Sequence, residues 1–107
     1  MKVVTAIRTE VTRIAYTTSH TVNSTYIAAV HQVICQIGQR IVTGIILEHR
    51  SGQLYLYPDC PQVAEFWAMT QEHVNHSGKP RLGAWASLNL RECTSYNLGI
   101  TQDSVGQ

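Results

Sequence analysis

The chain has 107 residues, of which 44% are apolar and 14% are charged, and its net charge is +1 at pH 7. This length and apolar content fit one compact domain, while the few, scattered basic residues exclude the dense cationic patch that non-specific nucleic-acid binding needs. No window approaches the roughly 18 apolar residues that span a bilayer, and the first residues lack the apolar segment of a secretion signal, so we expect a cytoplasmic protein without nucleic-acid or membrane partners.

The first part of the chain changes its hydrophobic period. Residues 2–16 are rich in β-branched side chains and alternate with a period of two, which predicts a strand. A polar loop at 17–23 follows. Over 25–37, apolar residues recur at spacings of three and four, which predicts a helix that stops at Gly38. The apolar stripe of this helix consists of Ile27, Val30, Ile34, Ile37 and Ile41.

The middle of the chain has the pattern of a β-hairpin. Residues 41–47 form a short, apolar and β-branched run, which favours a buried strand. The segment 50–53 has the composition of a turn, and the alternating residues 54–57 supply the returning strand.

A second helix is predicted from Pro61 to Ser77. Asp59 and Gln62 resemble a capping box, and Pro61 fits the first helical turn, where a missing N–H costs nothing. Pro80 prevents the helix from continuing. The side chains expected to face inward are those of Val63, Phe66, Trp67, Thr70 and Val74.

The last part of the chain predicts further strands. Residues 82–90 alternate with a period of two, and 96–100 suit a short extra C-terminal strand. A single domain is expected at 1–101, followed by a disordered tail at 102–107. The order strand, helix, strand, strand, helix, strand predicts an α+β protein of the ferredoxin-like split βαβ type (βαββαβ). In that fold two helices cover one face of an antiparallel sheet.

The opposite face of such a sheet has no helices, and we expect Leu54 and Leu56 to point away from it, toward the helices. Their neighbours Tyr55 and Tyr57 then lie on the open face, where Trp85 of the last predicted strand joins them. An exposed aromatic patch is typical of an interface or a ligand platform. The leading hypothesis is a non-enzymatic binding or assembly module, homo-oligomeric through this face, with a small ligand enclosed between subunits.

Cys60 supports a second hypothesis, a small thiol-dependent enzyme. In the first turn of a helix, unpaired N–H groups and the helix dipole favour the nucleophilic thiolate. His49 is the candidate base, with His31 and His73 as alternatives. His31 and Cys35, four residues apart on the first predicted helix, are a further pairing of thiol and base. A small residue that fills the corner between strand and helix is the simpler interpretation, which favours the non-enzymatic hypothesis.

The remaining motifs do not identify an activity. The three cysteines are too widely spaced for a disulfide framework, and we expect them to be reduced. No Cys-x-x-Cys pair, phosphate-binding glycine loop or nucleophile elbow occurs in the sequence, so neither a metal site nor a cofactor is expected. A third hypothesis is an inhibitor or immunity-type protein that acts by surface complementarity with a protein partner.

Overall fold

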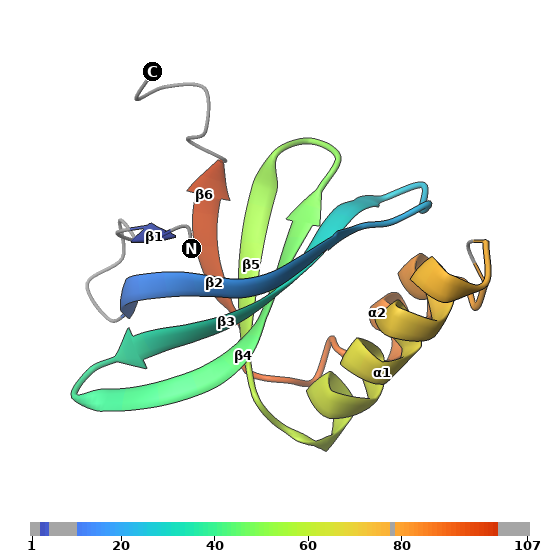
Figure 1. Cartoon of the computed structure of the whole chain (residues 1–107). Coiled ribbons are helices and arrows are strands. Elements are labelled where there is room, and N and C mark those ends of the chain that lie inside the picture. The colour runs from blue at the N-terminus through green and yellow to red at the C-terminus, as the bar shows by residue number, and fades with distance from the viewer. Residues whose placement is uncertain (1–2, 5–10, 78, 101–107) are drawn as a thin grey trace.

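A computed structural model describes residues 3–4, 11–77 and 79–100 of the chain. In this part of the chain, six strands form one antiparallel sheet in which each strand pairs with its neighbour in sequence (Figure 1). The elements are β1 (Val3–Val4), β2 (Val11–Thr21), β3 (Ile27–Ile37), β4 (Arg40–His49), β5 (Gln53–Pro58), α1 (Pro61–Asn75), α2 (Leu82–Asn89) and β6 (Tyr96–Ile100).

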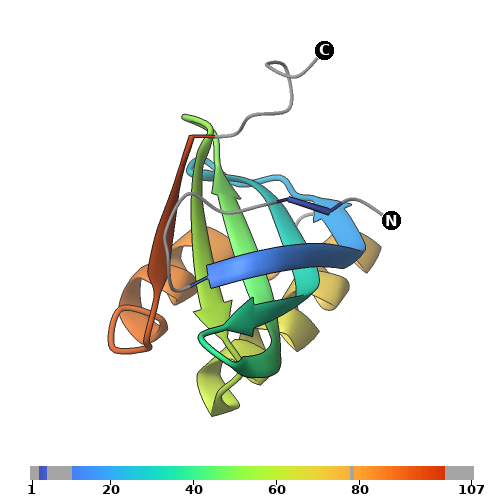
Figure 2. The same ribbon diagram turned by 90° about the vertical axis from the view of Figure 1, so that its left-hand side faces the viewer.

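The sheet curls because β2 is bulged. Its register with β3 shifts between Thr12 and Ala15 and again between Tyr16 and Thr18. Arg13, within the first of these shifts, has a φ of 55°. Bulges bend a strand and increase its twist. As a result β2 runs across the face of β4 and β5 (Figure 2).

The curl creates a core without helices on one face of the sheet. We call this cluster the inner core, and it joins β2 to strands that are not its neighbours in the sheet. Its buried residues are Val11, Ile14, Tyr16, Val33, Cys35, Ile37, Ile46, Leu54, Leu56 and Leu98.

Both helices pack on the other face of the sheet. We call the cluster between them and the strands the helix-side core. Its buried residues are Val22, Ile27, Val30, Ile45, Leu47, Val63, Phe66, Leu82 and Leu90. Neither helix that the structure describes is long and apolar enough to cross a bilayer. The prediction of an α+β protein with an antiparallel sheet and two helices on one face is confirmed at this level.

The ferredoxin-like βαββαβ order is not present, and the first reason is that residues 27–37 form strand β3 and not a helix. Val30 belongs to the helix-side core while Val33 belongs to the inner core. A strand buried on both faces carries apolar residues without a period of two, and the register shift between Ile27 and Ala29 changes its phase further. The resulting spacing of threes and fours imitates a helix.

The second reason is that residues 82–89 form helix α2 where a strand was predicted. The segment is rich in leucine and alanine, which are strong helix formers, and it lacks β-branched residues. Leu82 and Leu90 are each 1% exposed, so the helix is held by its packing on the sheet.

Other predicted elements agree with the structure. The hairpin is present as β4 and β5, with Gly52 at a φ of 93° in the turn, and β6 is the expected extra strand. Helix α1 begins at the expected Pro61 and ends at Asn75. The capping box is wrong: Cys60 occupies the N-cap without a side-chain cap, and Asp59 instead accepts a hydrogen bond from the Thr43 hydroxyl. The predicted tail at 102–107 lies outside the described residues.

Candidate functional site

The aromatic residues predicted for the open face lie on the helix side. Strand β5 places Leu54 and Leu56 in the inner core, so Tyr57 packs against the helix-side core. Tyr55 contacts His49 on the neighbouring strand, with ring centroids 5.0 Å apart. The expectation that these leucines face the helices is therefore wrong, because the curl of the sheet supplies a second apolar environment.

Trp85 lies on helix α2, whereas both tyrosines lie on strand β5. Its ring centroid is 5.8 Å from that of Phe66 on α1. It therefore joins the two helices, and the expected platform of Tyr55, Tyr57 and Trp85 on a sheet face without helices does not form.

A pocket of about 390 Å³ opens between the sheet and α2. It contains two of the residues that the sequence singled out, Tyr57 and His49. The residues that matter for its chemistry are Tyr26, Leu47, His49, Tyr57, Ser87 and Arg91.

The local sequence explains the shape of this pocket. Leu47 and Tyr57 lie on the helix side of adjacent strands, and they form its floor. Gly83 of α2 lies against Tyr26: a Cβ at Gly83 would be 3.6 Å from a ring carbon of Tyr26 and 3.2 Å from the Ser24 hydroxyl. The absence of a side chain on Gly83 thus lets Tyr26 form a wall beside the helix.

Two polar groups give the pocket its electrostatic character. Burial, followed by the charges of Cys93 and Tyr55, raises the pKa of Tyr57, so its hydroxyl stays protonated and can donate a hydrogen bond at neutral pH. Arg91 follows α2 and has no carboxylate partner within the part of the chain that the structure describes. The pocket therefore combines aromatic walls with a guanidinium that no carboxylate of the described residues neutralises.

A second constellation, which the sequence did not predict, crosses three strands. His31 on β3 lies with its Nδ1 2.7 Å from the Ser19 hydroxyl on β2 and its Nε2 2.9 Å from Glu48 Oε1 on β4. A carboxylate can only accept, so Nε2 carries the proton and Nδ1 accepts from Ser19. This is the order of groups in a serine–histidine–carboxylate relay.

The strand register brings this relay together, since Ser19 pairs directly with His31. The same strand geometry separates His31 from Cys35, because four residues of strand span about 13 Å. Cys35 is buried in the inner core, so the pairing of His31 with Cys35 is wrong. The sequence contains a histidine and a glutamate on two strands that pair, His31 on β3 and Glu48 on β4. Only the strand register shows that their side chains meet.

His73, another predicted base, is buried, and both of its ring nitrogens already have hydrogen-bond partners. Its Nδ1 donates to the Pro80 carbonyl at 2.7 Å, and its Nε2 accepts from the Asn23 backbone N–H at 2.9 Å. His73 therefore connects the β2–β3 loop to the segment between the helices, and this arrangement leaves no ring nitrogen for a thiol.

Cys60 has a different neighbour from the one expected. Its Sγ lies 3.5 Å from Sγ of Cys93, and neither thiol is in a disulfide. Burial, then the hydrogen bond with Cys60, then the charges of Cys60 and Glu92 raise the pKa of Cys93 to about 11. The predicted base His49 is remote: Cys60 follows Pro58, which pairs with Gly44, and the five residues of β4 from there to His49 span about 16 Å.

No three His, Cys, Asp or Glu side chains gather as a metal site among the residues that the structure describes. Comparisons of the chain with models of protein families, with curated proteins and with solved structures gave no significant match.

Proposed function

We propose that the protein is a non-enzymatic binding module that holds a small aromatic carboxylate in the pocket between the sheet and α2. The observation that carries this proposal is the guanidinium of Arg91, which has no carboxylate partner among the described residues, beside the aromatic walls of Tyr26 and Tyr57. A guanidinium binds a carboxylate with two parallel hydrogen bonds. Aromatic walls favour a flat ring over an aliphatic chain of the same size.

The size of the pocket supports a small ligand. Its volume of about 390 Å³ lies at the lower end of the range of about 300–1,000 Å³ for small-molecule sites. The Tyr57 hydroxyl and the His49 ring supply further polar groups that can orient the bound molecule. A single aromatic ring with one acidic group satisfies all of these features.

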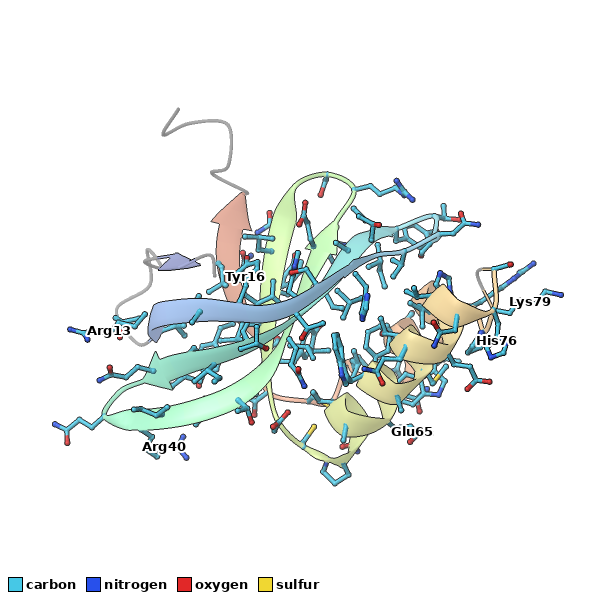
Figure 3. The ribbon with its side chains drawn as sticks, in the orientation of Figure 1. Arg13, Tyr16, Arg40, Glu65, His76 and Lys79 are labelled. Atoms are coloured by element: carbon cyan, nitrogen blue, oxygen red, sulfur yellow. The ribbon has the colours of Figure 1, made fainter. Side chains whose placement is uncertain are left out.

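The test compares benzoate with benzamide, which has the same ring but no charge. We expect benzoate to bind, measured by calorimetry or by chemical-shift changes at Tyr57, and benzamide to bind about tenfold more weakly. Arg91→Gln should remove this preference. Arg40→Gln is the matched control, because Arg40 is exposed at the tip of the β3–β4 hairpin, away from α1 (Figure 3). Equal binding of both compounds, or equal effects of the two substitutions, would contradict the proposal.

The proposal includes assembly of two copies of the chain, as a cytoplasmic homodimer that encloses the ligand. Tyr26 and Leu88 are 69% and 68% exposed, and Tyr26 lines the pocket, so a second copy over the opening would bury apolar surface and cover the ligand together. Leu88→Glu should yield a monomer in sedimentation experiments. Ile41→Glu is the control, since Ile41 is 77% exposed near the tip of the β3–β4 hairpin. An unmodified protein that is monomeric at high micromolar concentration would contradict assembly.

A second candidate function, ester hydrolysis by Ser19, is favoured by the distances in the Ser19–His31–Glu48 relay. His31 would take the hydroxyl proton as Ser19 attacks the ester carbonyl carbon, and Glu48 would stabilise the resulting imidazolium. The ester C–O bond then breaks, the leaving alcohol takes the proton from His31, and water releases the acyl group from Ser19 as the acid. Hydrolysis of p-nitrophenyl acetate should then be lost in Ser19→Ala and kept in Ser51→Ala, an exposed serine of the β4–β5 turn. Equal rates for both variants would refute this function. The inhibitor hypothesis stays a prediction.

A further inference from the structure

The thiols of Cys60 and Cys93 meet although 33 residues separate them in the sequence, with their sulfur atoms 3.5 Å apart. Both side chains pack at the edge of the helix-side core and are partly exposed. Cys35, by contrast, is 2% exposed in the inner core on the other face of the sheet. The chain therefore contains one pair of neighbouring thiols and one isolated thiol.

The backbone on both sides holds this pair in place. Next to Cys60, the Asp59 N–H donates to the Thr43 carbonyl at 3.0 Å, and the Ala64 N–H donates to the Cys60 carbonyl at 3.0 Å. The Cys93 N–H donates to the Leu90 carbonyl at 3.0 Å. The two sulfur atoms are thus positioned by a strand–helix junction and by the end of α2.

We infer that Cys60 and Cys93 form a reversible dithiol–disulfide site that reacts with low-molecular-weight disulfides of the glutathione type. A disulfide bond is about 2.05 Å long, so the two sulfur atoms need to approach each other by about 1.5 Å. The inference requires rotation about the side-chain bonds and a small shift of the turn after α2 to supply this movement. This inference does not depend on the ligand pocket.

The reaction has two steps that balance. The Cys60 thiolate attacks one sulfur of the disulfide compound and forms a mixed disulfide, and one thiolate leaves. Cys93 then loses its proton to solvent and attacks the Cys60 sulfur, which releases the second thiolate. One disulfide compound is reduced to two thiols, and the protein dithiol is oxidised to one disulfide.

The surroundings assign the two roles. The raised pKa of Cys93, about 11, keeps this thiol protonated at neutral pH, which leaves Cys60 to react first. Cys60 also lines an open hollow of about 630 Å³ beside Trp67, from which a reagent reaches its sulfur. Cys93 is the resolving thiol because it is already in contact with the sulfur that it must attack.

The experiment titrates the protein with mixtures of reduced and oxidised glutathione and follows its intact mass. The Cys35→Ala variant, which keeps the pair, should lose the mass of two hydrogen atoms and both reactive thiols, with full reversal by dithiothreitol. Cys93→Ser should instead accumulate one glutathione adduct on Cys60. Cys60→Ser should react severalfold more slowly than Cys93→Ser, because burial, the largest cause of the raised pKa of Cys93, remains in this variant.

A second measurement keeps the test independent of any single variant. An intramolecular cross-link between α1 and the end of α2 restricts the unfolded chain, so the oxidised Cys35→Ala protein should have a higher urea midpoint than its reduced form. Circular dichroism verifies that each variant is folded. Two titratable thiols that persist in oxidised glutathione, separate adducts on both cysteines, or disulfide-linked dimers would each overturn the inference.

Discussion

Gly44 illustrates how a close contact restricts a single position. It lies on β4, where an added Cβ would contact the carbonyl oxygen of Tyr57 and lie 3.0 Å from Cα of Pro58. These are backbone atoms of β5 that cannot rotate away. Gly44 thus permits the close approach of the two strands just before the chain turns toward Cys60.

We expect Gly44→Ala to destabilise the protein by about 1–3 kcal/mol, because the added methyl group has to push β5 aside. Gly38→Ala is the comparison: it has no neighbour within 4 Å, but its φ of 61° makes alanine strained, which costs about 1 kcal/mol. Urea unfolding measures both changes. A smaller loss of stability for Gly44→Ala than for Gly38→Ala would show that β5 yields readily.

The Cys93 thiol predicts a pH dependence of stability. Its pKa rises from 9.0 to about 11 in the folded protein, so the folded state holds the proton more tightly than the unfolded state. The resulting stabilisation is complete below pH 9 and is lost as the pH rises toward 11. The difference in unfolding free energy between the reduced protein and its Cys93→Ser variant should therefore decrease over this range. A constant difference would mean that the thiol is equally acidic in both states.

At the scale of elements, α1 is attached to the sheet by its buried face. Phe66 is fully buried and contacts Trp85 of α2, while His73 connects the helix to the β2–β3 loop. The first helical turn has neither an acidic residue nor a side-chain cap. Packing therefore supplies the stability that local capping does not.

Phe66→Ala should cost about 3–5 kcal/mol, since it removes a large side chain that both helices share. Val74→Ala is the control on the same helix, because Val74 is 41% exposed, and its cost should stay below about 1 kcal/mol. Thermal unfolding followed by circular dichroism separates the two. Similar losses for both variants would mean that the contact between Phe66 and Trp85 contributes little to holding α1 on the sheet.

At the scale of the whole molecule, β3 belongs to two cores at once. Val30 and Val33 are both fully buried, the first beneath the helices and the second inside the curl of the sheet. Because one strand supplies both clusters, neither core can come apart while the other keeps its packing. The two faces are thus expected to unfold together.

Val30→Ala and Val33→Ala should each lower the unfolding free energy by about 2 kcal/mol without changing its dependence on urea concentration. Tyrosine and tryptophan fluorescence and far-ultraviolet circular dichroism should give coincident transitions for both variants. A second transition in either variant would indicate that the helix layer separates from the curled sheet.

The sequence alone determined the elements whose signals are local. The β4–β5 hairpin follows from a turn between two β-branched or alternating runs, and α1 follows from Pro61 and a helical apolar period. The predictions for residues 27–37 and 82–89 are wrong, because a strand buried on both faces loses its period of two and because leucine and alanine also alternate in a short helix.

Which side chains meet depends on how the sheet curls and where the helices pack on it. The bulges of β2 curl the sheet over its own face, and this provides the inner core that takes Leu54 and Leu56 and turns Tyr57 toward α2. The Ser19–His31–Glu48 relay depends on strand register, and the Cys60–Cys93 contact depends on where α2 ends. Neither depends on spacing along the chain, since packing on a curved sheet sets the distances between residues that are remote in sequence.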